Sequence, residues 1–85
     1  MKKIVYTTHG TCSRVIYLTI DDSGRIADVS FIGGCNGNLQ GICRLVKGMD
    51  AEEARRKLDG IMCGDKGTSC PDQLAKAINE ALKKA

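Results

Sequence analysis

Apolar and polar residues alternate with a period of two over the first third of the chain, the pattern of β-strands with one buried face. Three segments, residues 2–8, 13–20 and 25–32, carry this alternation or are rich in β-branched residues. The side chains expected to face inward are Ile16, Leu18 and Ile20 in the second segment and Ala27, Val29 and Phe31 in the third. The DDSG turn at 21–24 would close a hairpin. The pattern predicts a three-stranded antiparallel sheet with one apolar face.

The period of the apolar residues changes to that of α-helices in the rest of the chain, over 37–47, 51–58 and 71–83. Gly48 and Gly60 follow the first two of these segments and are expected to end helices. Asp50, three residues before Glu53, resembles a capping box, in which an N-terminal side chain bonds to the helix amides. Amphipathic helices need an apolar surface, and the predicted sheet provides one. We therefore expect an α+β fold in two layers, with about three helices packed on one face of the sheet.

Length and charge limit the class of protein. A chain of 85 residues has room for one hydrophobic core, so we expect a single domain over 1–85. The net charge is +3, and four of the lysines lie at the two chain ends, where they would mainly keep the protein soluble. No basic stripe interleaved with aromatic residues indicates nucleic-acid binding. No stretch resembles a signal peptide or the roughly 20 apolar residues of a membrane span. We expect a cytoplasmic protein without a nucleic-acid or membrane partner.

Five cysteines are many for a cytoplasmic chain of this length. A disulfide framework is not expected, because cytoplasmic thiols stay reduced and an odd number leaves one thiol unpaired. Four of the five lie at the ends of predicted elements, where loops reach the surface: they are Cys12, Cys35, Cys63 and Cys70. Cys43 instead falls on the apolar stripe of the first helix, where a cysteine is a small buried residue.

Four loop thiolates match the ligand set of tetrahedral zinc or of an iron–sulfur cluster, although the chain contains no C-x₂-C pair. We expect Cys70 as the N-cap of the last helix, with Pro71 in the first helical position. There the free amides and the helix dipole would favour a thiolate. His9 and Asp65 are the remaining candidate ligands, and their settings are more typical of a loop residue and a turn residue.

Several longer segments resemble the TSCPD domain, named for the motif at Thr68–Asp72. The resemblance spans residues 10–82. The segments that carry it are GTCS, GGCNGNLQGI, LVKGM, GIMCG and TSCPDQLAKAI. This domain occurs alone in small bacterial proteins and as the C-terminal part of some adenosylcobalamin-dependent ribonucleotide reductases. The resemblance implies a metal-binding module whose four motif cysteines are here Cys12, Cys35, Cys63 and Cys70.

The order of parts is also distantly similar to iron–sulfur scaffolds of the NifU/IscU type. Cys12, Cys35 and Cys70 would occupy their three cysteine positions, whereas Cys63 has no clear counterpart. Those scaffolds carry an acidic residue where this chain has Arg14 and a histidine where it has Ser69. A fourth thiolate in place of such ligands would suit a closed site better than a labile delivery site.

These features predict a small metal-binding module with a four-cysteine site, zinc being favoured, that is accessory or related to ribonucleotide reductase and could have such an enzyme as its protein partner. One alternative is an iron–sulfur scaffold or carrier. Another is a thiol redox partner that uses Cys63 and Cys70, although the chain has no C-x-x-C motif. Eighty-five residues cannot hold a nucleotide site, a cobalamin site and radical chemistry, so we expect no catalysis by this chain on its own.

Overall fold

The structure is a computed structural model that describes residues 1–8, 13–33, 36–61 and 68–83. Its strands are β1 (Lys2–Thr7), β2 (Ser13–Ile20) and β3 (Ile26–Gly33), and its helices are α1 (Asn36–Val46), α2 (Ala51–Leu58) and α3 (Cys70–Lys83). Each bound lies within one residue of the bound expected from the sequence. The strands pair antiparallel in the order β1-β2-β3, so β2 is central and β1 and β3 form the edges.

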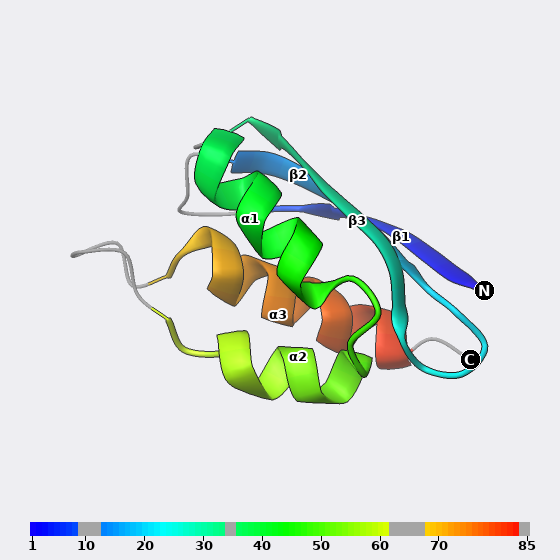
Figure 1. Ribbon diagram of the computed structural model, residues 1–85. Helices are drawn as coiled ribbons and strands as arrows, with labels where there is room; N and C mark the ends of the chain where they lie inside the picture. The colour runs from blue at the N-terminus through cyan, green and yellow to red at the C-terminus, as the bar shows by residue number, and fades with distance from the viewer. Residues whose placement is uncertain (9–12, 34–35, 62–67, 84–85) are drawn as a thin grey trace.

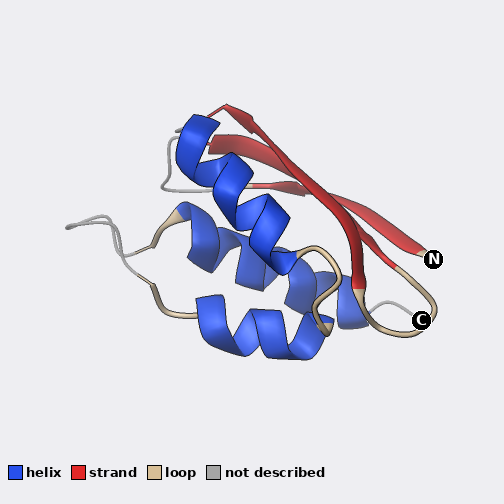
Figure 2. Cartoon of the chain, in the orientation of Figure 1, coloured by secondary structure: helices blue, strands red, loops and turns tan. Residues whose placement is uncertain are grey.

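The helices lie on one side of the sheet and leave its other side open (Figures 1 and 2). Helix α1 packs on β3, and α3 packs on β1 and β2. Helix α2 packs mainly against α3 and so lies farther from the sheet. This arrangement confirms the expected α+β fold in two layers.

The hydrophobic core forms where α3 meets the inner face of the sheet. Ile16, Leu18 and Ile20 of β2 are fully buried, as their alternation predicts, and Leu74 and Ile78 of α3 lie opposite them in the same cluster. Leu74 and Ile78 are one helical turn apart, so they project from the same side of α3. These core contacts determine which side of α3 faces the sheet. They therefore also determine the directions in which the side chains of its first turn project.

The inward face of β3 differs from the prediction at its first residues. Ile26 is 1% exposed, whereas Ala27, expected to face inward, is half-buried. The register explains the difference: Thr19 pairs with Asp28 but Ile20 pairs with Ile26, so Ala27 is an extra residue, a β-bulge. The bulge shifts the alternation by one position, and Val29 and Phe31 then face the helices as expected.

Backbone hydrogen bonds to the α1–α2 connection hold the bulged end of β3. The Ile26 N–H donates to the carbonyl of Met49 (2.9 Å), and the Gly48 N–H donates to the carbonyl of Ile26 (2.8 Å). Gly48 has φ +87°, the left-handed conformation expected for a glycine that ends a helix. The Oδ2 atom of Asp50 then accepts the N–H of Glu53 at 3.1 Å, which confirms the expected cap of α2.

Candidate functional site

The structure describes two of the five cysteines, Cys43 and Cys70, and neither forms a disulfide. Three of the predicted ligands lie outside the described residues: Cys12, Cys35 and Cys63. The two further candidate ligands, His9 and Asp65, also lie outside them. Within the described ranges, no group of three or more His, Cys, Asp or Glu side chains is arranged to hold a metal ion. The residues on either side of the segments that carry these three cysteines are nevertheless described, so their positions in the fold are known.

The chain segments that flank the cysteines gather at one end of the sheet. Cys12 directly precedes Ser13, the first residue of β2, and Ser13 pairs with Gly33, the last residue of β3. At the end of β1, the Thr8 N–H donates to the carbonyl of Arg14 at 3.0 Å. Helix α1 begins at Asn36, directly after Cys35. The ends of β1 and β3 and the beginnings of β2 and α1 therefore share one end of the molecule, at the left of Figure 1.

The end of α2 and the beginning of α3 lie at this same end of the molecule (Figure 1). A side-chain hydrogen bond ties them together, because the hydroxyl of Ser69 donates to the carbonyl of Ile61 at 2.6 Å. Ile61 is the last described residue before Cys63, and Ser69 directly precedes Cys70. All four predicted ligands are thus in, or close in sequence to, chain segments at one end of the fold.

The N-cap of α3 is Ser69, and the expectation that Cys70 has this role was wrong. The Oγ atom of Ser69 accepts the N–H of Asp72 at 3.1 Å, and its carbonyl accepts the N–H of Gln73 at 2.8 Å. A serine hydroxyl is a much better acceptor for a helix amide than a thiol, which explains the choice. Cys70 and Pro71 therefore occupy the first two helical positions, where amides have no intrahelical acceptor and proline is tolerated.

Asp72 is the centre of a buried hydrogen-bond network. It is 2% exposed, and its carboxylate accepts the hydroxyl of Thr68 (2.5 Å), the N–H of Gly60 (2.8 Å) and the ammonium of Lys76 (3.0 Å). Burial alone would raise the pKa of Asp72, but these hydrogen bonds and the charge of Lys76 outweigh burial and lower it below 3.8. Asp72 is thus an ionised carboxylate that joins the end of α2 to the beginning of α3.

Gln73 completes this network, which we call the α3 clasp: Thr68, Ser69, Asp72 and Gln73. Its Nε2 atom donates to Oγ1 of Thr68 at 2.9 Å, and all four residues are buried. No buried side-chain nitrogen or oxygen in the described ranges lacks a hydrogen-bond partner. The sequence prediction missed the clasp, although a serine followed three residues later by an acidic residue is a signal for a helix N-terminus.

Cys70 and Pro71 are half-buried, whereas the other three residues of the motif, Thr68, Ser69 and Asp72, are buried. Cys70 lies in the first turn of α3, where the partial positive charge of the helix favours a thiolate. A helix of fourteen residues whose first turn is fixed by the clasp holds this cysteine in a defined position. The arrangement can supply one oriented soft ligand at the end of the sheet.

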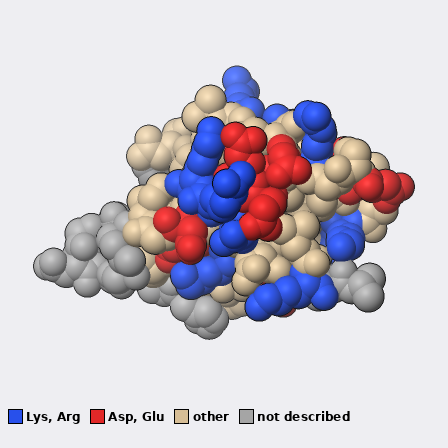
Figure 3. Space-filling model, turned by 90° about the horizontal axis from the view of Figure 1, so that it is seen from below, with Lys and Arg blue, Asp and Glu red and all other residues tan. Residues whose placement is uncertain are grey.

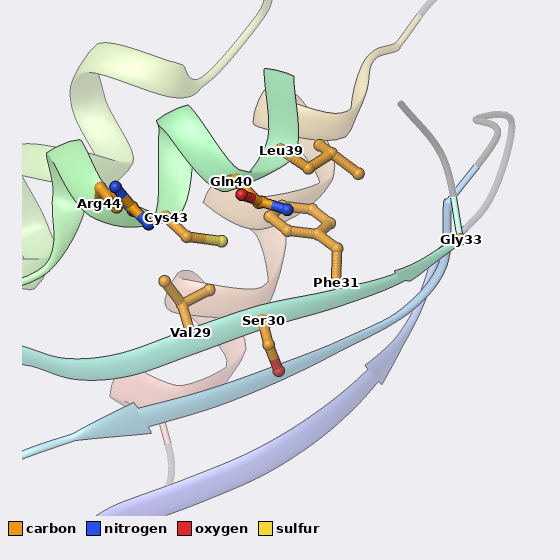
Figure 4. A pocket seen from close by; sticks show the side chains of 8 residues that line it. All are labelled: Val29, Ser30, Phe31, Gly33, Leu39, Gln40, Cys43 and Arg44. Carbon is orange, nitrogen blue, oxygen red and sulfur yellow. The ribbon is translucent and has the colours of Figure 1, made fainter. Parts of the chain in front are cut away.

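Cys43 has a different environment. Its Sγ atom points into the space between α1 and β3, an open pocket of about 290 Å³ whose lining includes Val29, Phe31 and Leu39 (Figure 4). Burial raises the pKa of the Cys43 thiol, and the nearby charge of Asp28 adds to the effect. Cys43 also packs against the hydrophobic core, which matches the expectation that it is a packing residue of the helix face.

Charged residues of both signs lie side by side on the face of the molecule that carries α2 (Figure 3). On this helix Arg55 pairs with Glu52, and Lys57 lies 3.3 Å from Glu53. Their spacing of three or four residues places the partners on neighbouring turns. Both carboxylates of α2 are therefore paired with a cation of the same helix. Among the described helices, none is both long enough and apolar enough to cross a bilayer.

The protein is a small α+β domain with a three-stranded sheet and three helices on one side of it. The α3 clasp fixes a cysteine, Cys70, in the first turn of the last helix. The sequence matches the TSCPD domain over residues 1–82, and the chain belongs to this family. No curated protein and no solved structure matches the chain. The more distant similarity to NifU/IscU scaffolds is therefore not borne out.

Proposed function

We propose that this protein is a small metal-binding module whose ligands are Cys12, Cys35, Cys63 and Cys70, with zinc as the favoured metal. The observation that carries the proposal is the gathering of chain ends. Two ligands are direct neighbours of β2 and α1, a third follows the end of α2, and Cys70 opens α3. These elements come from four separate parts of the chain, and all meet at one end of the fold (Figure 1).

The chemistry of the donors favours a closed site. Four thiolates complete the tetrahedral coordination of zinc and leave no position open for substrate, which is typical of structural sites. Cys70 fits this role because the α3 clasp fixes the turn that carries it. A bound metal would link separate elements of a small fold, and the free energy of metal binding would add to the stability of that fold.

The test is the metal content and visible absorption of protein purified anaerobically without chelator. One zinc per chain and no colour would support the proposal. Iron with sulfide and a charge-transfer band would instead favour an iron–sulfur scaffold or carrier. A metal-free protein with five titratable thiols would contradict both and leave a thiol redox partner that uses Cys63 and Cys70.

Single Cys→Ser variants identify the ligands. We expect loss of metal from the variants at Cys12, Cys35, Cys63 and Cys70. Cys43→Ser is the matched control, because its thiol is neutral and lies among apolar residues of α1 and β3. Metal loss from Cys43→Ser equal to that from Cys70→Ser would contradict the assignment, and metal retained by Cys63→Ser would favour the scaffold alternative.

The family resemblance is the basis for a relation to ribonucleotide reductase. We therefore propose that such an enzyme is the partner of this protein, and we assign no reduction of ribonucleotides to the chain itself. The protein would act beside such an enzyme as an accessory module. Titration of the metal-loaded chain against an adenosylcobalamin-dependent ribonucleotide reductase that lacks its own TSCPD part tests this role. Saturable binding is the expected result, and the absence of binding at about 100 µM, roughly the upper range of weak specific complexes, would contradict it.

A further inference from the structure

The face of the sheet that points away from the helices is open, and four of its nine side chains are apolar. Nine side chains of β1, β2 and β3 form this outer face: Lys3, Val5, Thr7, Val15, Tyr17, Thr19, Asp28, Ser30 and Ile32. Val5 is 64% exposed, Tyr17 47% and Ile32 48%. A solvent-facing side of an antiparallel sheet normally carries polar residues at such positions. Exposed apolar residues that touch one another indicate an interaction surface.

The register arranges these nine residues in three rows across the sheet, because each position on β2 pairs with one on each edge strand. The rows are Lys3–Thr19–Asp28, Val5–Tyr17–Ser30 and Thr7–Val15–Ile32. Val5 adjoins Tyr17 in one row, Tyr17 adjoins Val15 along β2, and Val15 adjoins Ile32 in the next row. The four apolar side chains thus form one continuous band across the outer face.

The two charges of the outer face lie at opposite ends of one row, Lys3 on edge strand β1 and Asp28 on edge strand β3. The face is therefore neutral, so it offers no preference for a strongly acidic or basic partner. It is, however, complementary to itself. A two-fold axis along β2 places β1 of one copy over β3 of the other, and each Lys3 then faces an Asp28 of the second copy.

We propose that the outer face is the interface of a two-fold symmetric homodimer in which two sheets pack face to face. The same axis places Tyr17 against Tyr17 and Val15 against Val15 at the centre, as expected for an isologous interface. An in-plane axis perpendicular to the strands would instead place Asp28 over Ile32 and bury an unpaired carboxylate. The rotation of about 30° between aligned packed sheets shifts the edges more than the centre and keeps the corner charges near one another.

The small area of the interface limits its strength. Three strands spaced about 4.8 Å apart and five residues long cover a patch of roughly 14 by 17 Å. Two such patches bury less than the roughly 1,200–2,000 Å² of stable protein complexes, so we expect a weak and reversible dimer.

Sedimentation velocity over a concentration series of the chain, with reductant present to prevent disulfide-linked dimers, measures this equilibrium. We expect a monomer at about 1 µM and a growing dimer fraction toward about 500 µM, as for the small interfaces of transient complexes. Lys3→Glu and Asp28→Lys should each weaken association about tenfold or more, because each variant places two like-charged pairs across the axis. Lys47→Glu, a charge reversal of the same kind on the exposed surface beyond α1, is the matched control and should leave association unchanged.

A mixture of the two weakened variants provides the decisive measurement. In a heterodimer of Lys3→Glu with Asp28→Lys, both corner pairs again join opposite charges, so the mixture should associate about as tightly as the wild type. Tyr17→Thr, which keeps a good strand residue at the centre, should weaken association without changing the charges. A chain that stays monomeric at 500 µM, or single variants that weaken association without recovery in the mixture, would overturn the proposal. Association of both single variants equal to that of the wild type would also overturn it.

Discussion

Replacement of Asp72 by alanine should destabilise the protein more than any other single polar substitution in α3. Asp72 is buried and accepts hydrogen bonds from Thr68, Gly60 and Lys76. Without the carboxylate, the buried hydroxyl of Thr68 and the N–H of Gly60 lose their acceptor. Lys76 loses less, because its side chain is 49% exposed and its ammonium can return to water.

The magnitude follows from the two donors that lose their acceptor. A buried donor without an acceptor costs roughly 1–3 kcal/mol, and Gly60 lies near the surface, so we expect a total of about 2–4 kcal/mol. Domains of this size have a free energy of unfolding of about 4–13 kcal/mol, so the loss is a large part of the total. At about 4–8 °C per kcal/mol, the midpoint of thermal unfolding should fall by roughly 10–30 °C. Asp72→Asn keeps the shape and one acceptor and should cost about 1–2 kcal/mol.

The pH dependence separates the charge of Asp72 from its shape. The folded pKa of Asp72 is lowered below 3.8, its value in the unfolded chain, so the unfolded state binds more protons between the two values. The stability contributed by this carboxylate is therefore complete above about pH 4 and is lost as the pH falls through the folded pKa. The difference in unfolding free energy between the wild type and Asp72→Asn should accordingly shrink below pH 3.8.

Urea unfolding followed by far-ultraviolet circular dichroism, at several pH values from neutral to acid, measures both effects. Glu80→Gln is the matched control, because Glu80 lies on the exposed side of the same helix and should change stability by at most about 0.5 kcal/mol. Both proteins are compared without metal, so the lower metal affinity expected for Asp72→Asn does not enter the difference. Equal stability of Asp72→Ala and the wild type, or a difference for Asp72→Asn that does not change with pH, would refute the reasoning.

Four further substitutions or treatments test other parts of the fold. Ser69→Ala removes the N-cap of α3 and its hydrogen bond to the Ile61 carbonyl and should cost about 1–2 kcal/mol in urea unfolding, whereas Ser69→Thr, which keeps the hydroxyl as donor and acceptor, should recover most of it; equal losses would contradict the cap assignment. Gly48→Ala should cost about 1–2 kcal/mol from backbone strain alone, because φ is +87° and nothing lies within 4 Å of the added Cβ; Gly48→Asn should cost less, and the reverse order would be a contradiction. Leu74→Ala, which leaves a cavity in the core, should cost about 2–5 kcal/mol. A thermal midpoint within a few degrees of the wild type would contradict the placement of Leu74 in the core. Alkylation of the Cys43 thiol in a variant without the other four cysteines should be slow at neutral pH and accelerate only above the ordinary thiol pKa of 9.0, because burial raises the pKa of this group; rapid reaction at pH 7 would contradict the packing role.

The elements could be predicted from the sequence because their signals are local. The alternation of Ile16, Leu18 and Ile20 and the helical spacing of Leu74 and Ile78 each appear within a few residues of chain. The bulge at Ala27 could not be predicted in the same way. It depends on hydrogen bonds between Ile26 and the distant Gly48–Met49 connection, and alternation alone contains no information about such a contact.

The candidate site combines both kinds of information. The N-cap signal of Ser69 and Asp72 is local, but the adjacent Cys70–Pro71 pair also resembles the beginning of a helix and competes with that signal. The contact of Asp72 with Gly60 is non-local, since the two residues are twelve positions apart and meet only after α2 packs against α3. The gathering of chain ends likewise depends on the register of the sheet, in which Ser13 meets Gly33.

The geometry of the α3 clasp gives the motif that names the family a physical meaning. Thr68, Ser69 and Asp72 turn inward and use their polar atoms to join α3 to the end of α2, whereas Cys70 between them remains half-buried. Thr68, Ser69 and Asp72 therefore form a support for the first turn of α3, which carries the half-buried Cys70 and Pro71. If Cys70 is a metal ligand, as we propose, damage to the support should weaken metal binding without removing a ligand. A folded Asp72→Asn variant should then still take up one metal ion per chain, with lower affinity, whereas Cys70→Ser should lose the metal. Competition with a chromophoric chelator and the spectrum of the cobalt-substituted protein distinguish these outcomes, because an unchanged thiolate-to-metal band with reduced affinity is expected only of the support.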